Sequence, residues 1–258
     1  MLATEDNLVL ANRVMRFDSE VSKSGDTIHI PNLANVTAVT KTPGTALTAA
    51  ANTETEYTIS VDQHKAVYQI IEDITSAQSD ANLMGLYTQK IGYALAEAVD
   101  TSLAGLYSGL SQSVDCSTAV TDANIISGVE YLDVANAPRS DRSFVIHAEA
   151  MADLRGVDKF IAYDQTGSKG VQVGNGLVAN VYGVDVFMSN NIVTASGTPD
   201  VIHNLLFHKE AFGLAIQKSV SVESDRSLSE VGDELLGQVL YGVSELRDAF
   251  AVDMQLDS

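Results

Sequence analysis

A long connection between two alternating segments constrains the fold more than any other feature of this sequence. Ile28 and Ile30 alternate with polar residues in the first segment, and Tyr57, Ile59 and Val61 do so in the second. Roughly two dozen residues, mainly Thr and Ala, separate them, and a loop of that length is uncommon inside a compact domain. A two-stranded hairpin is marginal alone in water. The pattern therefore predicts a long hairpin that leaves the body of the protein and lies on another chain.

The clearest helical pattern covers about residues 80–109, with Ser79 and Asp80 as candidate N-caps. Apolar or small residues recur at three- and four-residue spacing: Leu83, Tyr87, Ile91, Ala94, Leu95, Ala98, Ser102, Leu106 and Leu110. Polar residues occupy the opposite side: Lys90, Glu97, Asp100 and Thr101. About 29 residues at ~1.5 Å each predict an amphipathic rod on the order of 44 Å.

The rest of the chain mixes short helices with strands. We expect the first strand to end at Pro31, and a second helix to begin at its N-cap Asp122 and to be stopped by Pro138. A short helix is expected over 148–154. Strands are expected over 144–146, 182–188, 201–207, 211–217, 220–223, 238–243 and 250–254. Segregated helices and mainly antiparallel strands predict an α+β protein.

The charge balance argues against tight binding of nucleic acid by the monomer. Asp and Glu number 34 against 15 Lys and Arg, which gives a net charge of −19. Affinity for DNA comes mainly from Lys and Arg that displace condensed counterions. A negatively charged wall could still enclose DNA, or the charge could simply keep an abundant protein soluble.

Nothing in the sequence predicts a membrane segment or a secretory signal. No stretch approaches the ~18 consecutive apolar residues of a membrane span. The N-terminal residues have no basic region before an apolar stretch, so we expect no signal peptide. The single cysteine, Cys116, excludes an intrachain disulfide and fits a reducing cytoplasm.

Several motifs approach a catalytic or cofactor-binding pattern without completing it. Residues 174–179 match G-x-G-x-x-A, but the following residues read as a strand, whereas a dinucleotide site needs a helix there. Lys169 has no helix behind it, and residues 164–167 are one residue away from an aspartic-protease triplet with no second copy. We therefore expect no catalytic residue and no cofactor, and predict that the chain is not an enzyme.

The remaining candidate residues also have plain structural interpretations. The five histidines lack the spacing of a zinc site, and His203 and His208, at the two ends of an expected strand, suit surface or interface roles. Cys116 has no nearby cation to activate its thiol. The pairs at 72–73 and 233–234 are interpreted as a solvated acidic face. No metal site is expected.

The order of these elements resembles the major capsid proteins of tailed double-stranded DNA phages, which have the Hong Kong 97-type fold. The resemblance covers nearly the whole chain, and no single motif is decisive. Four passages carry it: Asn12-Arg13-Val14 through Gly25–Ile30, Val61-Asp62-Gln63 through Glu72-Asp73-Ile74 with the following helix, Tyr182–Val186 with Ser189-Asn190-Asn191, and His208–Ala215.

The resemblance implies a division into five segments. These are an N-terminal arm (1–24), an extended loop or E-loop (25–74), a peripheral domain with a long spine helix (75–121), an axial domain (122–207) and a return to the peripheral domain (208–258). Such subunits form hexamers and pentamers and then an icosahedral shell around the genome, so the implied location is the virion. The arm follows Met1 directly, so a separate scaffolding protein is expected. A portal and decoration proteins are further possible partners.

Five charged residues are candidates for contacts between subunits, from their charge and position: Arg13, Arg16, Lys41, Glu54 and Glu56. No lysine can be assigned to the covalent cross-link that some relatives form. Two alternatives remain open at this point: an encapsulin-type shell of a bacterial compartment, which shares the fold, and a soluble nucleotide-binding enzyme that uses residues 174–179.

Overall fold

The computed structural model describes residues 8–21, 27–33, 38–46, 54–74, 83–157 and 180–258. The helices are η1 (Leu10–Asn12), α1 (Asp18–Val21), α3 (Leu83–Ala104), η2 (Gly105–Gly109), α4 (Asp122–Val134), α5 (Ala148–Arg155), η4 (Lys209–Ala211) and η5 (Asp248–Phe250). The strands are β1 (Met15–Arg16), β2 (Thr27–Leu33), β3 (Glu54–Ser60), β4 (Gln63–Glu72), β5 (Ser113–Asp115), β6 (Arg142–Ile146), β7 (Asn180–Val181), β8 (Val184–Met188), β9 (Thr194–Ala195), β10 (Val201–His208), β11 (Phe212–Ser227), β12 (Gly232–Glu245) and β13 (Ala251–Asp257). The α+β class is confirmed.

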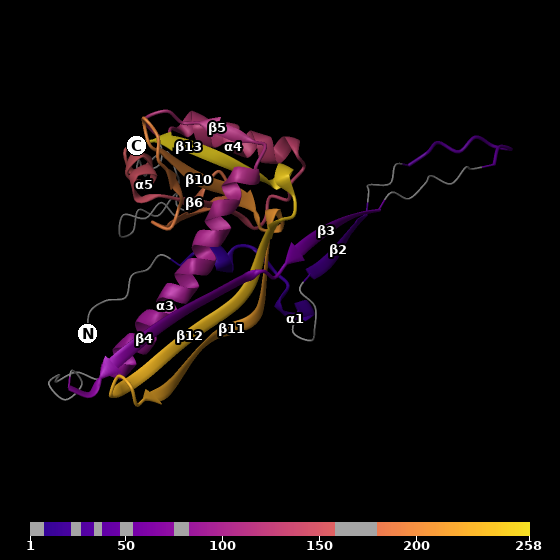
Figure 1. Ribbon diagram of the computed structural model, residues 1–258. Coiled ribbons are helices and arrows are strands. Elements are labelled where there is room, and N and C mark those ends of the chain that lie inside the picture. Colours follow the sequence, from indigo (N-terminus) through magenta and orange to yellow (C-terminus); the bar gives the residue numbers. More distant parts are fainter. Residues whose placement is uncertain (1–7, 22–26, 34–37, 47–53, 75–82, 158–179) are drawn as a thin grey trace.

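The predicted hairpin is present and projects away from the rest of the chain (Figure 1). Strands β2 and β3 pair antiparallel from Thr27↔Ser60 to Leu33↔Glu54, and residues 38–46 lie farthest from the body. The expected stop at Pro31 is wrong, because β2 continues to Leu33. In the described residues β2 pairs only with β3, and an edge strand tolerates a proline whose missing N–H would face outward.

The second sheet, called here the long sheet, has the order β1-β11-β12-β4 and carries α3 along one face (Figure 1). Gly237 of β12 lies under this helix, and a Cβ there would come within 2.2 Å of Ile91 Cγ2. Tyr241, also on β12, is within hydrogen-bond distance of Ser102 Oγ (2.7 Å) and donates to Ala98 O (3.1 Å). Helix α3 and the long sheet under it together form the spine of the subunit.

Two predicted helix boundaries need correction. The helix expected to reach residue 109 ends at Ala104 and tightens into η2, a common way of ending a helix. Its expected N-caps lie outside the described residues. The next helix is capped by Thr121, not by Asp122, and ends at Val134 before Pro138 is reached. Asn136 adopts a left-handed conformation (φ +58°), which terminates that helix.

The third sheet, called here the compact sheet, has the order β5-β13-β10-β6-β8-β7, with β9 paired to β10. Its pairs are antiparallel except β5 with β13 and β6 with β8. The strand expected at 144–146 and the helix at 148–154 are confirmed. The two strands expected at 211–217 and 220–223 form one strand, β11, because register shifts between Ile216 and Ser221 interrupt its alternation.

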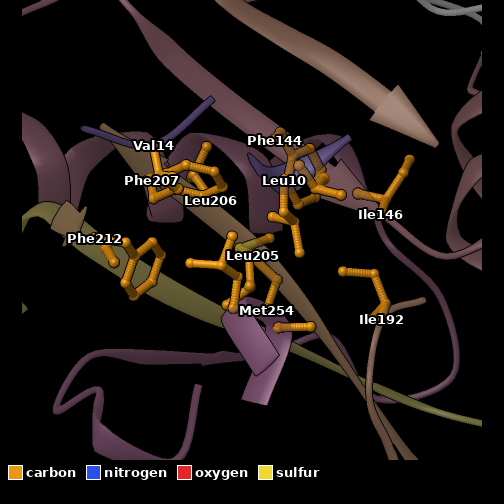
Figure 2. Packing of buried hydrophobic residues seen from close by; sticks show 14 of the residues in the cluster. Leu10, Val14, Phe144, Ile146, Ile192, Leu205, Leu206, Phe207, Phe212 and Met254 are labelled. Carbon is orange, nitrogen blue, oxygen red and sulfur yellow. The ribbon is translucent and has the colours of Figure 1, made fainter. Parts of the chain in front are cut away.

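The main hydrophobic core joins this compact sheet to the N-terminal arm. Figure 2 shows Leu10 and Val14 from the arm beside Phe144, Leu206 and Phe207 of the sheet. All five side chains are almost fully buried. The described part of the arm therefore packs on its own chain.

Candidate assembly surfaces

The hairpin holds three of the five candidate contact residues. Glu56 Oε1 lies 2.5 Å from Nδ1 of His29 on the paired strand, and both side chains are exposed. Lys41 donates to the backbone oxygens of Thr42 (3.3 Å) and Thr45 within its own loop. Glu54 pairs through its backbone with Leu33, and its side chain lies outside the described residues. Whether these residues contact another subunit stays a prediction.

The two arginines of the arm contact their own chain. The Arg13 guanidinium carbon lies 3.9 Å from the centroid of the Phe187 ring, and Arg16 pairs with Asp18 at 2.6 Å. Asp18 also accepts the Ile216 N–H (2.9 Å). These contacts fix the arm against both sheets, and an intersubunit role for either arginine stays a prediction.

Asp100 is a key residue that the sequence pattern placed on the wrong side of its helix. Its carboxylate is buried and accepts the N–H groups of Val9 (2.6 Å), Leu10 (3.1 Å) and Ala11 (2.9 Å). These N–H groups lie at the start of η1 in the arm, and the N-cap residue of η1 makes no side-chain capping bond. Burial raises the pKa of Asp100, and the three hydrogen bonds act in the opposite direction. One helix residue thus anchors the arm.

The expected surface roles of His203 and His208 are wrong, because both side chains are buried. Nδ1 of His203 lies 2.8 Å from Asp253 Oδ2 on the neighbouring strand, and its ring stacks on Tyr107 at 3.8 Å. His208 Nδ1 accepts the N–H of Glu210, and burial lowers the pKa of His208. Both histidines therefore connect elements inside the subunit.

The acidic pairs at 72–73 and 233–234 are more than a solvated face. Arg226 on β11 donates to Asp73 (2.6 Å through Nη1) and to Asp233 (3.3 Å). The guanidinium holds the pKa of Asp73 below its usual value. Arg226 thus bridges one carboxylate from each pair, Asp73 and Asp233, at the far end of the long sheet.

Cys116 is buried, and burial raises the pKa of its thiol from 9.0 to about 11. Since the thiolate is the reactive form, this shift alone lowers its population at pH 8 about 100-fold. We expect labelling by a thiol reagent at pH 8 to be at least about 100-fold slower in the folded chain than in urea. Equal rates in the two conditions would contradict the burial of this residue.

Among its described residues, the structure adds no chemical site to this picture. Residues 164–167, Lys169 and residues 174–179 lie outside the described ranges. Among the described residues, no three His, Cys, Asp or Glu side chains are placed to hold a metal ion. In the same ranges, no helix has the length and hydropathy needed to cross a membrane.

Comparisons by sequence and by structure differ in outcome. No protein-family model and no curated protein matches the chain. Solved structures match it along nearly its whole length. A chain from Mycobacterium phage Che8 is 26% identical with a TM-score of 0.80, over 98% of this chain and 94% of that one.

Two further structures extend the likeness. The capsid structure of the cyanophage P-SCSP1u matches with a TM-score of 0.80 at 20% identity, over 100% of this chain and 91% of that one. The head structure of Helicobacter pylori bacteriophage KHP40 matches with a TM-score of 0.77 at 11% identity, over 95% and 88%. These alignments therefore extend over nearly the whole of this chain.

Proposed function

We propose that this chain, which has the Hong Kong 97-type fold of tailed-phage capsid proteins, is a structural major capsid protein that builds the phage head. The observation that carries the proposal is the end-to-end match with the Che8 chain at a TM-score of 0.80 and 26% identity. The chain is a shell subunit of the virion and not an enzyme. Its likeness to the P-SCSP1u capsid and the KHP40 head supports the same conclusion.

The fold suggests a role for each segment of the subunit. We propose that 1–24 is the arm, 25–74 the extended loop, 75–121 and 208–258 the peripheral domain, and 122–207 the axial domain. The projecting hairpin supports the second assignment, with one qualification: β4 pairs with β12, so the end of the 25–74 segment lies in the long sheet. The compact sheet contains most of 122–207 but also β5 and β13.

The proposed partners are further copies of the chain, arranged as hexamers and pentamers in an icosahedral shell. A separate scaffolding protein, a portal and decoration proteins would complete the head, which assembles in the host cytoplasm. The shell would enclose double-stranded DNA without reading its sequence. A net charge of −19 suits a wall that repels packed DNA.

The direct test is to express the chain alone and with a candidate scaffolding protein, and to image the products by negative-stain electron microscopy. Closed or aberrant shells are the expected result. DNA-filled heads in infected cells would distinguish a capsid from an encapsulin-type compartment, which would hold cargo enzymes. Stable monomers or small dimers under both conditions would contradict the proposal.

The hairpin offers a sharper test because Leu33 and Glu54 are direct partners in its ladder. Replacing residues 34–53 by Asn-Gly joins these partners through a two-residue turn suited to antiparallel strands. We expect the shortened chain to keep the circular dichroism spectrum and melting temperature of the parent but to form at least about 10-fold fewer shells, since a projecting hairpin is not stable alone. Lys41→Ala, which also removes the bonds of this side chain to Thr42 and Thr45, tests separately whether that one candidate contact residue is needed for assembly. Normal shell yield from the shortened chain would show that the hairpin is not needed for assembly.

A further inference from the structure

Helix α4 carries an apolar groove on its outer side. The groove has a volume of about 500 Å³ and is lined by Ile126, Val129, Glu130, Asp133, Val134 and Tyr182. Three of its large apolar side chains are well exposed: Val134 at 74%, Tyr182 at 49% and Ile126 at 46%. A subunit that stayed alone in water would gain nothing from this exposure.

The same helix already has a complete inner face. Ile125, Gly128 and Leu132 are buried against the compact sheet, and a Cβ at Gly128 would come within 2.7 Å of Leu206 and 2.9 Å of Met254. A surface helix of an isolated domain needs one apolar stripe, and α4 has two. The second stripe, which includes Ile126 and Val134, is therefore available for another chain.

The charge of the groove limits how a second copy can bind it. Glu130 forms no ion pair with another described residue, whereas Asp133 pairs with Arg142 at 2.7 Å and lies 4.0 Å from Arg139. Two grooves placed face to face would bring the two Glu130 carboxylates together, which is unfavourable. The contact between copies should therefore join two different surfaces, and such contacts generate closed rings when the rotation closes.

A complementary cation lies on a different helix of the same unit. Arg155 is exposed in the last turn of α5. Helix α5 sits beside the start of α4, because Asp153 Oδ2 accepts the N–H of Val120 at 2.9 Å. Arg155 lies on a different helix from the groove-lining residues and can therefore serve as the second of the two surfaces.

We propose that the α4 groove receives the α5 end of a second copy, with Arg155 of that copy facing Glu130. This inference rests on the proposed capsid function. Six lining residues cover far less than the ~800 Å² per partner of a standard interface, so the groove cannot hold a dimer by itself. Repeated head to tail around a closed ring, the contact is made once by every subunit and adds to the hairpin contacts of a capsomer.

The test uses the full chain in the shell-assembly assay. Val134→Asp should reduce shell yield at least about 10-fold while the monomer keeps its melting temperature, because the side chain is exposed. Val134→Ile keeps the groove apolar and should assemble normally. Glu130→Arg and Arg155→Glu should each impair assembly, and the double variant should restore it.

The outcomes separate the two proposals. Rescue by the double variant supports the assigned contact. Normal assembly of Val134→Asp, or no rescue in the double variant while the parent forms shells, would overturn the groove contact and leave the capsid function intact. If the parent chain itself never forms shells, with or without scaffolding protein, the capsid function fails instead.

Discussion

Gly242→Ala should destabilise the subunit by about 3 kcal/mol, the upper range for forcing an extra group into a packed interior. A Cβ at this position would lie 2.2 Å from the Ser60 carbonyl oxygen, 2.8 Å from the Ser60 carbonyl carbon and 3.0 Å from Val61 Cα. All three are backbone atoms, so no side chain can rotate out of the way. Urea denaturation of the parent and the variant measures this difference in the free energy of unfolding.

The position matters because Ser60 and Val61 are where the chain passes from the hairpin strand β3 to β4 of the long sheet. Gly242 on β12 lets the base of the hairpin cross close to the sheet. Gly92→Ala is the matched control, because a Cβ there meets nothing within 4 Å and alanine favours a helix by roughly 1 kcal/mol over glycine. Equal stability of the two variants would mean that the crossing is not tight.

Local patterns were sufficient for most of the fold. The hairpin and the spine helix each have a period that a window of residues reveals, such as the alternation of Ile28 and Ile30. The central strands of the compact sheet are short, mainly apolar runs that are buried along nearly their whole length. The predictions were wrong where backbone geometry overrides that period. Pro31 remains inside a strand that has an open edge, and the register shifts of β11 hide a single strand behind two apparent ones.

The buried polar contacts could not be predicted, because their partners are distant in sequence. Asp100 looked like part of a solvated helix face, and its hydrogen-bond partners lie about 90 residues earlier in the chain. His203 and Asp253 are separated by 50 residues. The groove on α4 could not be predicted for a different reason: Ile126 and Val134 are apolar residues of a helix, and only the fold reveals that they face outward.

Asp100→Ala should cost about 3 kcal/mol of stability and release the arm, since buried donors left without an acceptor cost about 1–3 kcal/mol each. Asp100→Asn should cost less. An amide oxygen at the Oδ2 position keeps the Val9 and Leu10 bonds, while its NH2 group faces the Ala11 N–H that Oδ1 accepted. Hydrogen exchange at Ala11 should accelerate in both variants, and exchange at Leu10 should accelerate mainly in the alanine variant. Thr101→Ala, on the exposed side of the same helix turn, should leave stability and exchange nearly unchanged.

The pH dependence tests the burial of the Asp100 carboxyl group, whereas hydrogen exchange tests its hydrogen bonds to the arm. Because the folded-state pKa of Asp100 is raised, the native chain binds the proton more readily than the unfolded chain. The stability from this group is therefore fully present below the ordinary carboxyl pKa of 3.8 and is lost as the pH rises through the raised value. Asp100→Asn removes this titration, so its deficit relative to the parent should be largest at acidic pH and smaller near neutrality. A deficit that is constant across this range would mean that burial does not raise the pKa of this carboxyl. Unchanged exchange at the arm would mean that Asp100 only fills space beneath η1.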